Sequence, residues 1–305
     1  MNKIAQLLFF IALSATVVCL ICARTKAKRW WIGGLGLLLS AVLLTGYFIP
    51  VSVPVMDLSA ASETADTTYY DMIHKDCQKD EAADFRVKKY QLDFSVGLNL
   101  TGSAKVYVDR SELKSYRFTL YHGYKVKQVT DQTGAALDFR REYDYVTVTR
   151  GGADVEYLCL EYTGKSPKYY SSYAGVCLPA NFAYYPIPGY RELFKDSFYG
   201  FIDCSLPYDT AFDVRCSGRK QMYCNLAARG NNHFAGNARS ITLLSGYYDT
   251  LKLNDTLVVY PKYADGEIRA RIKKNMGTFT KEHRDIHTIS SWTRTILTPY
   301  EHLRS

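Results

Sequence analysis

The stretch 90-YQLDFSVGLNLTGSAKVYV-108 decides the fold, because its apolar residues alternate with polar ones instead of recurring at helical spacing. One face of its first half would carry large apolar side chains: Tyr90, Leu92, Phe94 and Val96. The same period of two returns at four later places: 104–108, 118–120, 146–148 and 158–162. Such alternation is typical of β-strands that are buried on one face.

Turn-forming residues separate the predicted strands. They occur at Leu100–Ser103, Asp131–Gly134 and Arg150–Gly152. Strands at this spacing predict a mainly β domain over residues 88–263, folded as a β-sandwich or one large twisted sheet.

The sequences on either side of this domain have different patterns. Residues 57–87 are mixed and polar with no strong period, which indicates a polar linker with some helix. Within residues 264–305 the apolar residues recur every three or four positions, which predicts a C-terminal amphipathic helix. The members of that stripe are Ile268, Ile272, Met276, Phe279, His283, Ile286, Ile289, Trp292 and Ile296.

Residues 1–56 contain two uncharged apolar spans, Ile4–Ala23 and Trp30–Met56. Each is long enough to cross a hydrocarbon core of about 30 Å, so the sequence predicts two transmembrane helices in a hairpin. An alternative for the first span is a cleaved signal peptide, but its apolar core is long and lacks a small-x-small cleavage pattern.

The loop between the spans would determine the topology. Its basic residues are Arg24, Lys26, Lys28 and Arg29, and it contains no acidic residue. Because basic loops are retained on the cytoplasmic side, residues 57–305 are expected outside the plasma membrane, with the lipid bilayer as a partner.

The net charge of +8 comes largely from the membrane-like region, since the first 50 residues hold basic side chains and no acidic ones. No dense basic stripe remains in the β-rich region. A nucleic-acid partner is therefore not expected.

No metal or cofactor site is predicted. The six cysteines after residue 56 form no Cys-x-x-Cys pair, and disulfides between them remain an open alternative to free thiols. His283 and His287 have helical i, i+4 spacing, but Arg284 stands where a zinc peptidase needs its glutamate.

No catalytic residue is predicted either, because the sequence has no Gly-x-Ser-x-Gly elbow and no phosphate-binding glycine loop. Residues 230–237 combine Gly and Asn, as a polar pocket or a tight strand connection would. The chain is rich in tyrosine, and the loop from 169 to 190 could face a ligand or pack as an ordinary sheet edge. The candidate ligand-facing residues are Tyr173, Tyr184, Tyr185 and Tyr190.

The order of segments resembles the amino-terminal β domain of the aminopeptidase N (gluzincin) family. The matching segments are 90–94, 100–106, 118–120, 126–134, 160–164, 212–218, 232–236 and 243–248. With Tyr184–Pro186 after a Tyr-rich loop, the chain is most similar to bacterial proteins in which such a part follows ABC transporter permease helices. That family holds zinc in the following domain through a His-Glu-x-x-His helix, and this sequence has no such motif. No catalytic or metal-binding residue is therefore carried over.

This resemblance implies a membrane-anchored extracytoplasmic β domain without catalytic activity of its own. It would act in binding or assembly with other membrane or transporter subunits, or with a separate peptidase domain. Two alternatives stay open: a truncated leading fragment of a membrane zinc metallopeptidase fused to a permease, and a standalone surface receptor for peptide or glycan.

Overall fold

The computed structural model describes residues 10–14, 16–17, 65–173, 175–195, 200–253, 256–261 and 288–290, and the single residues 31, 34, 35, 38, 41, 270 and 274. The chain divides into two compact units, Met1–Val53 and Pro54–Ser305. The second unit is mainly β, and it contains every strand named below.

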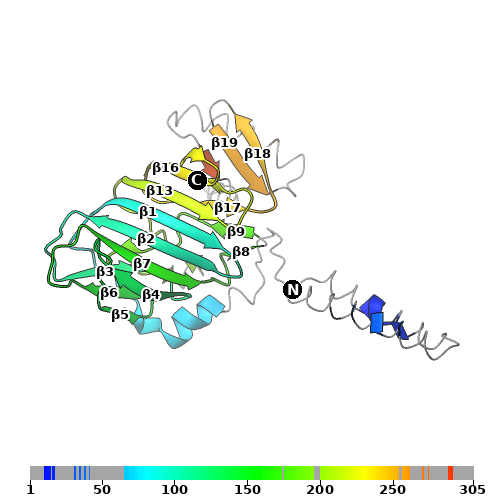
Figure 1. Ribbon diagram of the computed structural model, residues 1–305, viewed down its shortest axis with the longest axis horizontal. Helices are drawn as coiled ribbons and strands as arrows, with labels where there is room; N and C mark the ends of the chain where they lie inside the picture. The colour runs from blue at the N-terminus through cyan, green and yellow to red at the C-terminus, as the bar shows by residue number, and fades with distance from the viewer. Residues whose placement is uncertain are drawn as a thin grey trace, which may run out of the picture. The chain divides into compact units, whose positions relative to one another are not determined.

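A seven-stranded sheet forms the larger layer of the second unit (Figure 1). Its strands, in spatial order, are β15 (Ala227–Gly230), β16 (His233–Ala238), β13 (Thr210–Ser217), β1 (Val87–Val96), β2 (Leu100–Val108), β7 (Tyr157–Gly164) and β4 (Tyr124–Thr130). Neighbouring strands are antiparallel except for β1 and β13, which are parallel. A parallel pair needs a long connection, and here the chain from β2 to β12 lies between the two strands.

Two four-stranded sheets complete the sandwich. The first contains β10 (Ile187–Pro188), β3 (Ser115–Thr119), β6 (Tyr145–Thr149) and β5 (Phe139–Glu142). The second contains β14 (Tyr223–Cys224), β17 (Leu243–Ser245), β9 (Gly175–Leu178) and β8 (Ser171–Ser172). Inward side chains of all three sheets, such as Val106, Phe118 and Leu178, belong to one hydrophobic core.

The remaining elements are short. β11 (Phe194–Lys195) pairs with β12 (Gly200–Phe201), and β18 (Tyr248–Leu253), β19 (Thr256–Pro261) and β20 (Thr288–Ser290) form a three-stranded sheet. Before β1 come a π-helix, η1 (Thr68–Ile73), and a 3-10 helix, η2 (Lys75–Cys77).

Two buried tyrosines form hydrogen bonds inside the core. The hydroxyl of Tyr90 donates to the carbonyl of Pro186 at 2.9 Å, and that of Tyr162 donates to the carbonyl of Tyr184 at 3.0 Å. Each ring therefore fills core volume while its polar end has a partner, which avoids the cost of a buried unsatisfied group.

Alternation along 90–96 is confirmed as β1, but the turn predicted at Leu100–Ser103 is wrong, because these residues begin β2. The turn lies at residues 97–99. Gly102 is needed for a different reason: a Cβ there would stand 2.5 Å from Cζ of Tyr162 on the neighbouring β7. This glycine makes room for a core tyrosine and does not form a turn.

The two predicted transmembrane helices are not observed: in the described part of the chain, no helix has the length and apolarity needed to cross a membrane. Helical residues occur at 10–14, 16–17, 31, 34, 35, 38 and 41, and the other residues of Ile4–Ala23 and Trp30–Met56 lie outside the described residues. The basic residues Arg24, Lys26, Lys28 and Arg29 lie outside the described residues.

The C-terminal amphipathic helix also needs correction. Ala270 and Lys274 are helical, but β20 lies inside the predicted stripe and pairs in parallel with β19. Ile289 stands beside Val258 in this ladder. A β-branched residue such as Ile289 suits a strand as well as a helix stripe, so periodicity alone could not separate the two.

Candidate functional site

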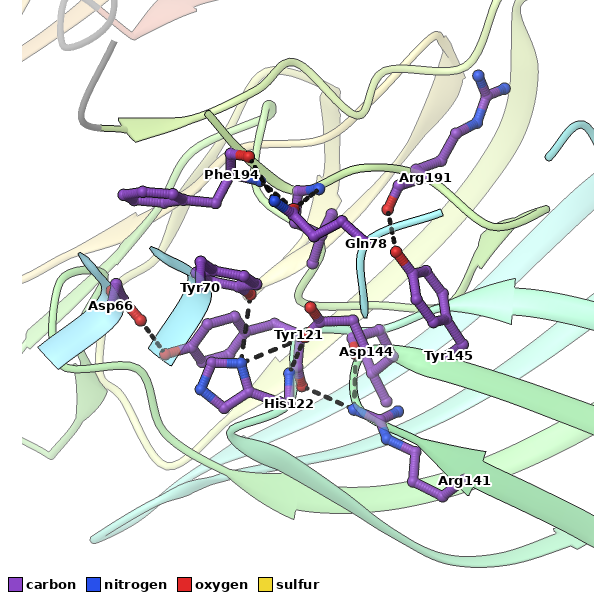
Figure 2. A network of polar contacts seen from close by, with 12 residues as sticks. Asp66, Tyr70, Gln78, Tyr121, His122, Arg141, Asp144, Tyr145, Arg191 and Phe194 are labelled. Carbon is purple, nitrogen blue, oxygen red and sulfur yellow. Dashed lines mark hydrogen bonds and ion pairs between the residues drawn. The ribbon is translucent and has the colours of Figure 1, made fainter. Parts of the chain in front are cut away.

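Residues 66–81, called the strap here, take part in a network of polar contacts with residues 121–122, 144–145 and 190–194 (Figure 2). The strap contains η1 and η2. The ring of Tyr70 is buried and stacks on Phe194, with centroids 5.0 Å apart and planes 7° apart. The strap is thus anchored in the hydrophobic core, although its sequence is mostly polar.

Asp66 begins the strap and is a buried acid. It is 2% exposed, and its Oδ1 accepts a hydrogen bond of 2.6 Å from the hydroxyl of Tyr121. Its Oδ2 has no hydrogen-bond partner among the described residues. Burial raises the pKa of Asp66, because an ionised carboxylate loses hydration there.

His122 and Asp144 form the centre of the network (Figure 2). Oδ1 of Asp144 accepts from the backbone N–H of His122 at 2.6 Å and lies 3.3 Å from the imidazole Nδ1. The hydroxyl of Tyr70 lies 3.2 Å from the same Nδ1. Tyr69 stacks on the imidazole at 3.5 Å and 8°.

This arrangement differs from that of a catalytic histidine. In a nucleophilic triad the carboxylate binds one ring nitrogen and the nucleophile binds the other. Here Asp144 and Tyr70 both contact Nδ1 of His122, so these contacts fix the ring.

Arg141 supplies positive charge beneath Asp144. Its Nη2 donates to the carbonyls of Leu120 and Tyr121 at 2.6 and 3.1 Å. Burial lowers the pKa of Arg141, and the Asp144 carboxylate opposes that shift. The guanidinium therefore serves as a structural cation that holds the chain segment preceding His122.

The second half of the strap binds mainly to the backbone of residues 190–194. The side-chain amide of Gln78 donates to the carbonyl of Phe194 at 2.9 Å, and its oxygen accepts from the N–H groups of Leu193 and Phe194 at 3.1 and 3.0 Å. Glu81 and Tyr190 exchange two backbone hydrogen bonds, at 2.7 and 2.8 Å. These contacts resemble those by which a β domain binds an extended peptide.

Lys79 lies between two aromatic rings. Its Nζ is 5.6 Å from the ring centroid of Tyr145 and 5.5 Å from that of Tyr190, and its backbone N–H donates to the Tyr145 hydroxyl at 2.5 Å. Both rings thus contribute to holding the strap.

The structure separates the four tyrosines that the sequence proposes as a ligand-facing loop. Tyr184 and Tyr185 are fully buried, and the Tyr184 hydroxyl donates to the carbonyl of Ile241 at 2.8 Å. Tyr173 is partly exposed, and its N–H bonds to Gly97. Only Tyr190 reaches the strap. Residues 230–237 form the turn and most of the second strand of the β15–β16 hairpin, the tight connection that was one of the two interpretations.

Sequence reasoning missed the strap and its residues Asp66, Tyr70 and Gln78. The pair Tyr69–Tyr70 in a mostly polar stretch was the available signal, because an aromatic ring can contribute a large apolar area to a core. Among the described residues, no group of three or more His, Cys, Asp or Glu could hold a metal ion. The six described cysteines are free, and His283 and His287 lie outside the described residues.

Comparison with known proteins gives a structural likeness only. No protein-family model matches the sequence, and no curated protein matches it significantly. One similar solved structure is an M1 zinc metallopeptidase from Deinococcus radiodurans, with a TM-score of 0.40, 13% identity and coverage of 68% of this chain and 57% of that one. Another is leukotriene A4 hydrolase from Saccharomyces cerevisiae, with a TM-score of 0.44, 10% identity and coverage of 75% and 41%.

The chain thus spans little more than half the length of the bacterial peptidase. A structural likeness with these TM-scores and identities does not assign a function to this chain.

Proposed function

We propose that this chain is a non-catalytic β domain of a peptidase-like protein and that it acts in binding or assembly. The observation that carries the proposal is how the strap is held. Gln78 and Glu81 bind the backbone of residues 190–194, and Tyr145 and Tyr190 flank Lys79. Backbone pairing combined with side-chain subsites is how proteins recognise extended chain segments.

The chemistry of the network supports the same proposal. His122 uses one ring nitrogen for its side-chain contacts with Tyr70 and Asp144, and Arg141 donates to two backbone carbonyls. These groups hold structure together. The peptidase-like part of the proposal rests on the segment order from residue 90 to 248 described above.

The surface-receptor alternative through the Tyr-rich loop has less support. Tyr184 and Tyr185 are fully buried, so neither ring can meet a ligand without unfolding the core around it.

An activity assay on the full chain tests the non-catalytic part. We expect no turnover of aminoacyl reporter substrates with added zinc, and metal well below one ion per chain after dialysis. A zinc aminopeptidase assayed in parallel serves as the positive control. Turnover that a chelator abolishes would contradict the proposal.

Cross-linking in the source cells tests the assembly part. Cross-links from the sandwich to a peptidase or transporter chain would support it, and a chain that forms none would count against it. A location outside the cytoplasm stays a prediction, which protease accessibility of residues 65–261 on intact cells would check.

A further inference from the structure

Several connections between strands lie together at one end of the sandwich. β1 ends at Val96 and β2 begins at Leu100, and the registers place the last residues of β7 and β13, Gly164 and Ser217, at this end of the large sheet. Figure 1 shows β8, β9 and β17 near the same end. The surface called the turn end here comprises residues 97–99, 165–168, 173, 218–221 and 246–247.

Hydrogen bonds hold these connections side by side. The backbone N–H of Tyr173 donates to the carbonyl of Gly97 at 2.7 Å. Nε of Arg219 donates to the hydroxyl of Ser245 at 3.0 Å, and that hydroxyl donates to the carbonyl of Gln221 at 2.6 Å. β9, which follows Tyr173, pairs with β17, which ends at Ser245. The turn end is therefore one continuous surface.

The turn end is basic and contains no acidic residue. Lys125 adds a further positive charge at its edge, because this residue is exposed and pairs with Thr163 in the β4–β7 ladder. The basic side chains of the turn end itself are Lys165, Lys168, Arg219 and Lys220.

The acids around the turn end are set back from it. Asp93 and Glu161 lie four residues before it along β1 and β7, about 13 Å away at strand spacing. Asp66 and Asp144, on the side of the strap, are buried. Asp249 lies on β18, two residues beyond the turn end. The turn end therefore presents net positive charge to an incoming surface.

Two large apolar side chains project from the same connections. Leu98 is 75% exposed and Tyr247 is 64% exposed. A single exposed apolar side chain needs no explanation, but two of them on adjoining connections, among lysines and without acids, form a specific pattern. Apolar groups beside basic groups are typical of surfaces that meet lipid, and tyrosine is enriched at the membrane–water interface.

We propose that the turn end docks on an anionic lipid surface as a peripheral contact. Leu98 and Tyr247 enter the interface between headgroups and acyl chains, where their apolar surface leaves water. The ammonium groups of Lys165 and Lys220 pair with the lipid phosphates. A lipid surface explains both features, whereas a nucleic acid would use the lysines and leave Leu98 in water.

This inference uses no residue of the strap and none of residues 1–56. It depends neither on the proposed function nor on the apolar spans of the sequence.

Fluorescence of the full chain in lipid vesicles tests the inference. In a Leu98→Trp variant the added indole reports contact of the turn end with lipid, and the three native tryptophans give a background that the unaltered chain measures. In vesicles of equal parts phosphatidylcholine and phosphatidylglycerol, we expect brominated acyl chains to quench the added emission. Vesicles of phosphatidylcholine alone should not quench it, and raised salt should release the contact.

Lys165→Gln and Lys220→Gln, introduced together into that variant, test the charge. They should raise the proportion of phosphatidylglycerol needed for half-maximal quenching by at least about 2-fold, because each lysine near an anionic surface contributes to the attraction. Lys114 supplies the matched controls, since it is exposed on the β2–β3 connection at the opposite end of the large sheet. Lys114→Gln should leave that proportion unchanged, and the indole of Lys114→Trp should not be quenched.

Thermal unfolding verifies that each variant is folded. Three results would overturn the inference: no quenching of Leu98→Trp that depends on phosphatidylglycerol, equal quenching of Lys114→Trp, or an unchanged proportion after the two lysine replacements. Binding of an oligonucleotide with the same lysine dependence, without quenching by lipid, would overturn it in favour of nucleic acid.

Discussion

Single residues of the strap carry unusual electrostatic and hydrogen-bonding roles. Asp66 is a buried acid with one oxygen unpartnered among the described residues, and Gln78 satisfies three backbone groups at once. Neither role follows from residue type, since most Asp and Gln side chains in a polar stretch are solvated. Each can be tested by a substitution that changes one chemical property.

Asp66→Asn should flatten the pH dependence of stability. Burial raises the folded-state pKa of Asp66 above its unfolded value, so the folded state binds this proton more tightly. The stability that this provides is fully present below the unfolded pKa, near 3.8, and is lost as pH rises through the folded pKa. Urea unfolding between pH 4 and 7 should therefore show the variant gaining relative to the wild type as pH rises. Parallel pH profiles would contradict this.

Gln78→Ala should lower the free energy of unfolding by about 2 to 4 kcal/mol, because the N–H groups of Leu193 and Phe194 lose their acceptor. Gln78→Glu keeps the acceptor and should cost less. Gln128→Ala, at an exposed position on β4, is the matched control. Denaturant unfolding measures all three, and equal stability of Gln78→Ala and Gln128→Ala would show that the Gln78 contacts contribute nothing.

At the scale of elements, periodicity predicted strands well where one face is buried and the other solvated. β1, β2 and β7 have that property, and their alternation could be recognised in the sequence. Sequence pattern could not predict the local structure where two structures satisfy the same pattern. Gly102 looked like a turn residue, but what required glycine was a tyrosine on another strand, a contact between residues far apart in sequence.

The strap could not be predicted for a related reason. Its contacts with residues 121, 122 and 194 are all long-range, so the Tyr69–Tyr70 pair could indicate burial, but no local pattern within residues 57–87 identifies the partners. The Tyr-rich loop has a clear sequence signal with two possible meanings, because its rings suit a ligand-binding face and a core equally well. Its contacts with Tyr90 and Tyr162 place it in the core.

Gly102→Ala should destabilise the β2–β7 pair by about 1 to 3 kcal/mol, because the added Cβ would lie 2.5 Å from Cζ of Tyr162 and force the ring to move. Gly152→Ala has no heavy atom within 4 Å of its Cβ and should be nearly neutral. Urea unfolding of both variants measures the difference. A Gly102→Ala protein as stable as the wild type would show that Tyr162 relaxes without cost.

At the scale of the whole second unit, one core joins the three sheets, and the strap joins that core mainly through Tyr70. The rest of the strap is held by hydrogen bonds and by the contact of Lys79 with the Tyr145 ring, which water can replace. Because local opening follows the elements with the fewest buried apolar contacts, we expect the strap to open separately from the sandwich.

Tyr70→Ala tests this separation. Removing a fully buried aromatic ring costs about 3 to 5 kcal/mol, and that loss should fall on the strap. Peptides covering residues 66–81 should then exchange amide hydrogens at least about 100-fold faster, since each 1.4 kcal/mol is tenfold, while β1 and β2 keep their protection. Met72→Ala, at a position 78% exposed, is the control. Equal acceleration in the strap and the central strands would show that the two unfold as one cooperative unit, since opening the strap would then require the core around Phe194 to open with it.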